Sequence, residues 1–408
     1  MGASTLAPSL AGPLAPHRPA HPIRMIDQTL PRPLSIELKL QQTGLDIRAQ
    51  FRVLPGRVCA LVGRSGAGKS ALLKAAAGLA PARGGRIAVG NEAMYDSAAR
   101  INKPPHERRL TWLDGHTHLF PHLTVRANLE YGLKGKGLRR TKPPAFDKVV
   151  NWLDIASLLA RRPEALTVSQ RVKVALARAL ISGPNALLLD DPLGDVPAHE
   201  QEPLLELLAE LPTRFHVPIV LVSPRMNEVI RLADEVVILH EGRMASAGPA
   251  AQILSDVSLS TFLEGVHAGS VLEGEVKRHD IEWLLSEVDV SGQRVTVPAM
   301  LHAVGSKVRL KVRARDISLH RAVPTDTSCS NHLRGRITQI MLAGEHGTYG
   351  AVGIELDRAL DADSLQIKSG SPLWAMLTRK SIQQMGWAPG QPVVVGFKAM
   401  ATTVSAWR

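Results

Sequence analysis

The feature that most constrains this chain is an eight-residue loop at residues 63–70, Gly-Arg-Ser-Gly-Ala-Gly-Lys-Ser. It matches the G-x-x-x-x-G-K-[ST] phosphate-binding pattern, follows an apolar run at residues 58–62 and opens an Ala/Leu-rich stretch at residues 70–79. In that order, a strand, a loop and a helix aim backbone N–H groups and a helix N-terminus at a polyphosphate. The pattern predicts a nucleotide site that contains Gly63, Arg64, Ser65, Gly66, Ala67, Gly68, Lys69 and Ser70.

Two carboxylates at a second strand end extend the predicted site. The apolar run at residues 186–189 ends in Asp190 and Asp191, about 120 residues after the loop. Lys69 is expected to neutralise β- and γ-phosphate oxygens of the nucleotide, and Ser70 to ligate Mg²⁺. Asp190 is expected to hold the same ion, often through water, and Asp191 to orient an attacking water as the catalytic carboxylate.

Length and composition limit the broad class. A chain of 408 residues predicts two or three domains, and no apolar run approaches the length of a membrane span. The net charge is +12, but Lys and Arg are spread along the chain and aromatic residues make up only 4%, which argues against nucleic-acid binding. The two cysteines, Cys59 and Cys329, form no disulfide framework, as is typical of a reducing cytoplasm.

The pattern of apolar residues divides the chain into three parts. Residues 1–30 are rich in Pro and Ala and are predicted to be a disordered tail, unless translation starts at Met25. Residues 31–264 alternate predicted strands and helices, which indicates an α/β domain with a largely parallel sheet. Residues 265–408 contain short alternating runs separated by turns, which indicates an all-β, barrel-like domain.

The individual elements of the α/β domain follow from periodicity. Alternation at residues 36–40 predicts a first strand. Further strands are predicted at 86–89, 110–113, 186–190, 217–222 and 235–239, and helices at 69–79, 145–160, 170–182, 199–211 and 225–233.

Beyond the two nucleotide motifs, residues from about 34 to 250 resemble the ATPases of ABC transporters. Leu-Phe-Pro-His-Leu-Thr-Val at 119–125 and Asn-Leu-Glu-Tyr-Gly at 128–132 are similar to the segment after the family's glutamine loop. Ala-Leu-Ala-Arg-Ala-Leu at 175–180 is similar to the helix after its signature motif, and residues 228–234 and 241–243 resemble its closing elements. The resemblance implies a head-to-tail dimer, with itself or with an intact ATPase, that binds ATP and Mg²⁺ and docks on a membrane permease.

The C-terminal region indicates which subgroup of this family the chain resembles. Residues 313–319, 378–381 and 388–392 resemble the ATPases of molybdate importers, which carry an appended OB-like, oxyanion-binding β-domain. This implies a peripheral protein on the cytoplasmic face of the inner membrane, with molybdate as a ligand of the β-domain. Thr378, Arg379, Lys380 and Ser381 are the candidate oxyanion donors, although the same residues can serve the fold or a dimer contact. The anion itself is left open among molybdate, tungstate and sulfate.

The chain departs from this family at the positions that act in hydrolysis. Gly115 stands where the family has its glutamine, and Val168 replaces a glycine of the signature motif. Asp191 is one methylene shorter than the catalytic glutamate, and Pro224 replaces the switch histidine and offers no donor.

These departures leave two interpretations open. One is a working but divergent ATPase that drives transport. The other is a nucleotide-binding pseudo-enzyme with a regulatory or oxyanion-sensing role. Only interactions that strengthen in the transition state speed the chemistry, so hydrolysis is expected to be weak.

A histidine cluster gives a weaker signal. His116, His118 and His122 lie within seven residues, a spacing compatible with Zn²⁺, but His122 belongs to the family's Pro-His-Leu string.

Overall fold

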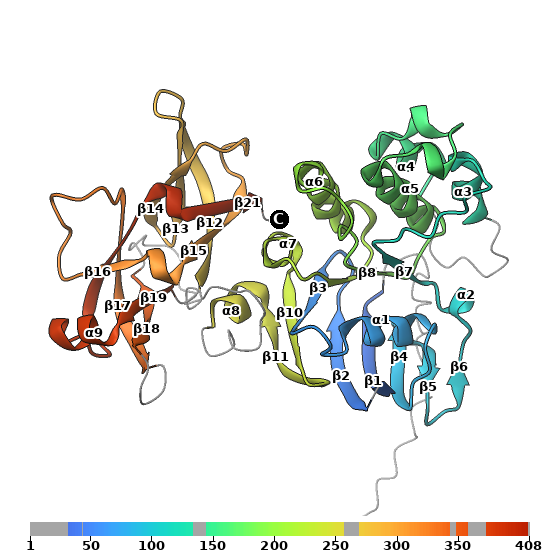
Figure 1. Ribbon diagram of the computed structural model, residues 1–408, viewed down its shortest axis with the longest axis horizontal. Helices are drawn as coiled ribbons and strands as arrows, with labels where there is room; N and C mark the ends of the chain where they lie inside the picture. The colour runs from blue at the N-terminus through green and yellow to red at the C-terminus, as the bar shows by residue number, and fades with distance from the viewer. Residues whose placement is uncertain are drawn as a thin grey trace, which may run out of the picture.

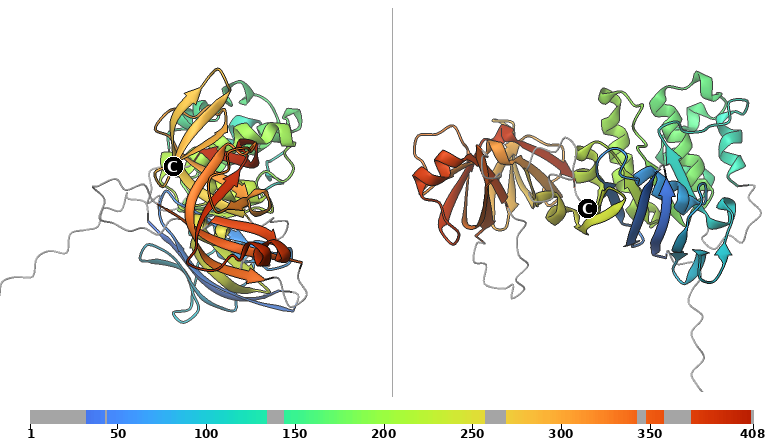
Figure 2. Two further views of the ribbon diagram at one scale, coloured as in Figure 1. Left: turned by 90° about the vertical axis from the view of Figure 1, so that its left-hand side faces the viewer. Right: turned by 60° about the horizontal axis from the view of Figure 1, so that its bottom comes forward.

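A computed structural model describes residues 32–42, 44–133, 144–256, 269–342, 348–357 and 373–406. The predicted N-terminal tail, Met25 and the predicted boundary at residues 264 and 265 lie outside these ranges. Figures 1 and 2 show two bodies side by side along the long axis, an α/β domain and a β-rich C-terminal domain.

The described part of the α/β domain contains one 11-stranded sheet in the order β6-β5-β4-β1-β2-β11-β10-β3-β9-β8-β7. Its strands are β1 (Leu34–Gln42), β2 (Leu45–Val53), β3 (Val58–Val62), β4 (Gly84–Val89), β5 (Glu92–Asp96), β6 (Ile101–Asn102), β7 (Leu110–Asp114), β8 (Ala186–Asp190), β9 (Ile219–Val222), β10 (Glu235–His240) and β11 (Arg243–Pro249). Every strand predicted for this domain is therefore present.

The prediction of a largely parallel sheet is wrong. The run β10-β3-β9-β8-β7 and the pair β11-β2 are parallel, whereas β1 pairs antiparallel with β2 and β4, β4 with β5, β5 with β6, and β10 with β11. The missed strands β2 and β11 are half exposed, and short turns connect them to their neighbours. A hairpin connection forces an antiparallel pair, while the parallel strands β3, β8 and β9 are buried along their whole length.

The helices are α1 (Lys69–Ala77), α2 (Pro105–Arg108), α3 (Val125–Tyr131), α4 (Phe146–Trp152), α5 (Val168–Ile181), α6 (Ala198–Phe215), α7 (Met226–Leu232) and α8 (Ala250–Ser255). The predicted helix at 145–160 ends early, because Asp154 takes a left-handed conformation with φ 51° and a separate 3₁₀ turn follows at Ala156–Leu158. Helices α3, α4 and α5 form a group at one end of the domain (Figure 1). None of the helices in the described ranges combines the length and apolar character needed to cross a bilayer.

The predicted β-rich C-terminal region is confirmed. Its described residues form two five-stranded sheets, β14-β13-β12-β15-β21 and β16-β20-β17-β18-β19. Their inward-facing side chains, among them Leu310 and Phe397, share one apolar core. The elements are β12 (Gly269–Asp280), β13 (Leu285–Val290), β14 (Gln293–Pro298), β15 (Lys307–Arg313), β16 (Ser318–His320), β17 (Asn331–Leu342), β18 (Tyr349–Leu356), β19 (Leu373–Thr378), α9 (Arg379–Met385), β20 (Pro392–Phe397) and β21 (Thr402–Ala406).

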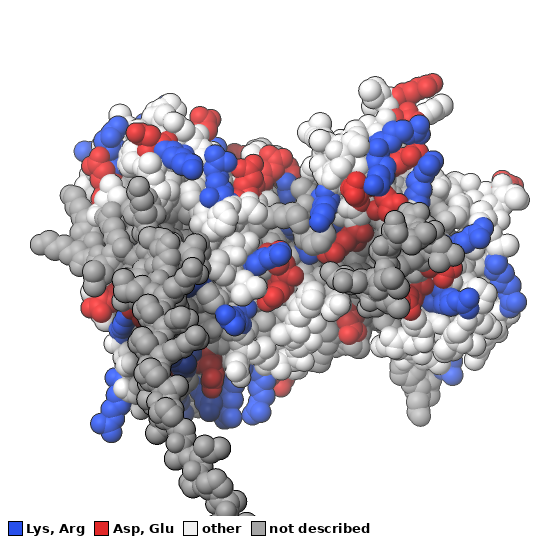
Figure 3. All heavy atoms as spheres, turned by 180° about the vertical axis from the view of Figure 1, so that it is seen from behind, with Lys and Arg blue, Asp and Glu red and all other residues white. Residues whose placement is uncertain are grey.

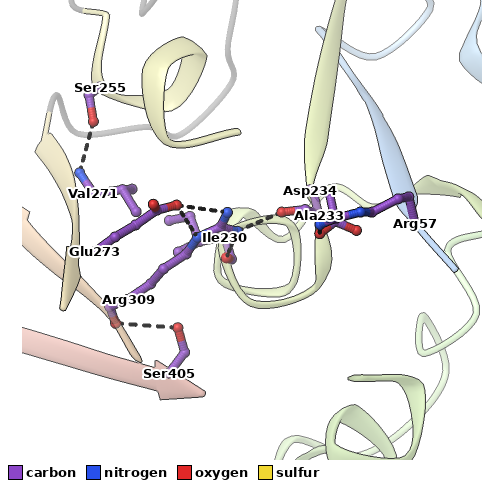
Figure 4. A network of polar contacts seen from close by, with 9 residues as sticks. All are labelled: Arg57, Ile230, Ala233, Asp234, Ser255, Val271, Glu273, Arg309 and Ser405. Carbon is purple, nitrogen blue, oxygen red and sulfur yellow. Dashed lines mark hydrogen bonds and ion pairs between the residues drawn. The ribbon is translucent and has the colours of Figure 1, made fainter. Parts of the chain in front are cut away.

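A buried arginine joins the two domains (Figure 4). Arg309 of β15 is 2% exposed, and its Nη1 donates to the carbonyl oxygens of Ile230 (3.2 Å) and Ala233, at the C-terminal end of α7. Its Nη2 pairs with Glu273 of β12 at 3.1 Å. Burial lowers the pKa of the guanidinium, and Glu273 opposes this shift. The end of α7 is thus capped by a charge from the other domain.

Candidate nucleotide site

The phosphate loop (residues 63–70) connects β3 to α1, as predicted. Gly63 has φ 147°, and a Cβ at this position would lie 2.0 Å from the carbonyl oxygen of Leu239, so only glycine fits here. Helix α1 packs its Ala and Leu side chains into the core beneath the sheet, which fixes its N-terminus behind the loop. The strand, the loop and the start of α1 therefore have the arrangement that the motif requires for binding an anion.

Lys69 lies over its own loop. Its Nζ donates to the carbonyl oxygens of Gly63 at 2.7 Å and Arg64 at 2.9 Å. A cavity of about 110 Å³ lies beside it, between loop residues and the segment after β9. Its lining consists of Val62, Gly63, Ser65, Lys69, Ser223, Pro224 and Met226. Pro224, which the family resemblance assigns to the position of the switch histidine, thus lies beside the phosphate loop and presents only a ring of carbon atoms.

The two predicted Mg²⁺ ligands meet. The Ser70 hydroxyl donates to Asp190 Oδ1 at 2.8 Å, and Asp190 is 9% exposed at the end of β8. A hydroxyl and a carboxylate are the hard oxygen donors that Mg²⁺ prefers, so this pair fits the ion.

An Asp190→Asn substitution tests this assignment. We expect ATP binding in the presence of Mg²⁺ to weaken more than ATP binding in EDTA, because the amide has lost the charge that attracts the ion. Calorimetry with and without Mg²⁺ measures both, and Asp195→Asn, an exposed carboxylate in the next loop, is the matched control. An unchanged Mg²⁺ dependence would remove Asp190 from the metal site.

Asp191 is held by a residue that the sequence analysis missed. Its Oδ1 accepts from Arg225 Nη2 at 2.8 Å, and Arg225 Nε is also bonded to the buried Glu228. Burial raises the pKa of Asp191, while Arg225 pulls it down and Glu228 and Asp190 push it up. The position of Arg225 directly after Pro224 could have indicated this role, because an arginine there can reach the end of the neighbouring strand β8.

Gly115 and Val168, the other two departures from the family pattern, lie on different elements of the domain. Gly115 follows β7 and packs against Asp191, since a Cβ on Gly115 would lie 3.3 Å from the Asp191 carbonyl oxygen. Val168 is the first residue of α5, and the helix start is closed by a capping box between Thr167 and Gln170. Val168 is half-buried against the core around α5 and does not line the cavity beside Lys69.

The oxyanion candidates gather at the start of α9. Thr378 is the N-cap: its Oγ1 accepts from the Ser381 N–H at 3.1 Å and lies 2.8 Å from the Ser381 hydroxyl. Because both hydroxyls take part in this cap, the contacts favour a role of Thr378 and Ser381 in the fold over a role as oxyanion donors. Lys380 is exposed.

The histidines do not assemble a metal site. The rings of His116 and His118 are 6.2 Å apart, and His118 Nε2 bonds Asp114. Within the described residues, no group of three or more His, Cys, Asp or Glu side chains can hold a metal ion.

A larger cavity of about 420 Å³ opens between β7 and the group of α3 and α5. Its walls include the aromatic side chains of Trp112, Phe120 and Tyr131 and the guanidinium of Arg178. Tyr131 is 55% exposed, so apolar surface reaches the rim. On the face in Figure 3, Lys and Arg are interspersed with Asp and Glu over both domains, so the basic excess forms no single patch there.

Comparisons with known proteins agree with this geometry. Residues 48–194 match the family model described as ABC transporter. The chain is 35% identical over 371 residues to the molybdenum import ATP-binding protein ModC of Rhodospirillum rubrum, covering 90% of this chain and 96% of that protein. It is 36% identical over 375 residues to ModC of Brucella melitensis, covering 92% and 99%, and 36% identical over 368 residues to ModC 1 of Azotobacter vinelandii, covering 87% and 98%.

Proposed function

This chain belongs to the ABC-transporter family of molybdenum import ATP-binding proteins, and from this premise we propose that it is the ATP-binding subunit of a molybdate importer. The observation that carries the proposal is the Ser70–Asp190 contact directly beside Lys69 in the phosphate loop. Lys69, the loop N–H groups and the start of α1 would bind the phosphates, and Ser70 with Asp190 would hold Mg²⁺. The metal would neutralise phosphate charge.

The partner in this proposal is a membrane permease, which places the chain at the cytoplasmic face of the inner membrane. The cavity lined by the half-buried Trp112 and Phe120 and the exposed Tyr131 supports such docking, because aromatic side chains in a concavity suit a helix of a partner. A head-to-tail dimer completes each site, formed either by two copies or with an intact ATPase.

Reconstitution tests the whole proposal. The chain, its permease and the binding protein are placed in vesicles, and molybdate uptake and ATP hydrolysis are measured with and without the permease. We expect uptake that requires this chain and ATP. ATP binding without uptake, and without stimulation by the permease, would favour the alternative of a non-hydrolysing regulatory or oxyanion-sensing protein, which the pairing of Asp191 with Arg225 also favours.

We further propose weak hydrolysis, supported by three altered positions, one of which is the carboxylate Asp191 itself. Gly115 has no side chain to offer, Pro224 has no donor, and Asp191 is pulled toward α7 by Arg225. Loss of a positioned base or of a charge stabiliser typically costs about 10²–10⁴ in rate.

Restoring the absent groups should raise turnover. The double substitution Asp191→Glu with Pro224→His is expected to increase kcat by at least about tenfold, because it returns a longer carboxylate and a donor that faces Lys69. Steady-state hydrolysis by the purified chain measures this, with each single variant as control. Wild-type hydrolysis equal to that of an intact relative would contradict the proposal of weak turnover.

The C-terminal domain is proposed to bind the oxyanion. Calorimetric titration of the whole chain with molybdate, tungstate and sulfate identifies the ligand. Lys380→Gln separates binding from capping, because Lys380 is exposed and takes no part in the Thr378 cap.

A further inference from the structure

The start of α7 carries a network of four polar residues that ends on Asp191. Ser223 Oγ accepts from the Arg225 N–H at 3.0 Å and donates to the buried Glu228 at 2.8 Å. Glu228 in turn bonds Arg225 Nε, and Arg225 Nη2 reaches Asp191 Oδ1 at 2.8 Å. Two of the guanidinium nitrogens are thus engaged on opposite sides, so the side chain of Arg225 is fixed between α7 and the end of β8.

The other oxygen of Asp191 is also confined. Asp191 has φ 48°, and its Oδ2 lies 2.8 Å from the point where a Cβ on Gly194 would stand. The carboxylate therefore lies against the backbone of Gly194 on one side and accepts from Arg225 on the other. Its direction is set by these two neighbours.

This arrangement puts a cation beside the carboxylate that the family resemblance assigns to the attacking water. Pro224 lines the cavity at Lys69, while the next residue, Arg225, points away to Asp191. In the segment after β9, Pro224 therefore presents carbon atoms to the cavity at Lys69, and Arg225 presents its positive charge to Asp191. The Asp191 oxygen that accepts from Arg225 is thus directed toward α7, and Asp191 does not line the cavity at Lys69.

We propose that Arg225 is a positioning residue that holds Asp191 against α7 and restrains ATP hydrolysis until this contact opens. The proposal rests on ATP hydrolysis as part of the proposed function. The restraint is modest, because the side chains of Arg225 and Asp191 are 30% and 37% exposed and such pairs are weak.

A double-substitution cycle in the full chain tests the proposal. We expect Arg225→Gln to raise kcat about two- to fivefold with little change in KM for ATP, since the phosphate contacts are untouched. Arg225→Lys should stay near the wild type because it keeps the charge. In an Asp191→Asn background, Arg225→Gln should have no effect on kcat, since the carboxylate on which it acts is gone.

A second readout uses no nucleotide. Arg225→Gln and Asp191→Asn should each lower the Tm, and the double variant should lower it by less than the sum of the two. Arg231→Gln is the matched control, because Arg231 also lies on α7 but pairs with Glu202 of α6, and it is expected to show no coupling with Asp191→Asn.

Three outcomes would overturn the proposal: a fall in kcat for Arg225→Gln, an absence of hydrolysis in that variant although ATP binds, or additive Tm changes in the cycle. Failure of the wild-type chain to bind ATP would instead refute the proposed function. The coupling between Arg225 and Asp191 would then be tested by the Tm cycle alone.

Discussion

Replacement of Lys69 by alanine is expected to weaken ATP binding by about 10- to 150-fold, the effect of losing a hydrogen bond to a charged group. Lys69 Nζ is bonded to Gly63 and Arg64 of its own loop, so its charge already lies at the loop that we propose binds the phosphates. Calorimetric titration with ATP measures the dissociation constant.

Lys74→Ala is the control for this experiment. Lys74 lies on the same helix but is exposed, with its Nζ 5.1 Å from the ring centre of Trp112. It should leave ATP affinity unchanged. Equal affinities in the wild type and the Lys69 variant would mean that the phosphate loop does not bind nucleotide.

Substitution of Arg309 by methionine is expected to destabilise the joint between the domains by about 2–4 kcal/mol. The change leaves the carbonyl oxygens of Ile230 and Ala233 without this donor and removes the cation beside Glu273. For a domain of this size we expect the Tm of the C-terminal transition to fall by about 5–10 °C in calorimetry.

Arg313→Met is the matched control, because Arg313 lies on the same strand and is exposed. It should change the Tm little. If Arg309→Met left the transition unmoved, the contacts at the end of α7 would contribute nothing to the joint, and the two domains would be held by apolar packing such as that of Val271 against Val236 and Ile253.

Local patterns in the sequence were enough to predict the strand, loop and helix of the phosphate-binding motif. The strand before the loop, the glycines and the helix after it lie next to one another in the chain, so their geometry is set by short-range sterics and hydrogen bonds. The Ser70–Asp190 contact was also predictable, since both motifs stand at the carboxyl ends of parallel strands and such ends meet at one edge of a sheet.

Sheet direction was less predictable. The amphipathic strands β2 and β11 have the same alternation whether they pair parallel or antiparallel, and their hairpin partners decide the direction. The end of α4 at Trp152 depended on the left-handed Asp154, which helical periodicity does not show.

The sequence by itself thus specified the phosphate loop, the contact between Ser70 and Asp190, and the division into an α/β and a β-rich part. Each of these depends on neighbours in the chain or on a strand order that the motifs imply. Only the tertiary structure revealed that Arg225 holds Asp191 across 34 positions and that Arg309 caps α7 from the other domain. Both contacts join residues far apart in sequence through long, flexible side chains. Their partners are chosen by what the folded backbone brings within reach and by the need to pair a charge that packing has removed from water.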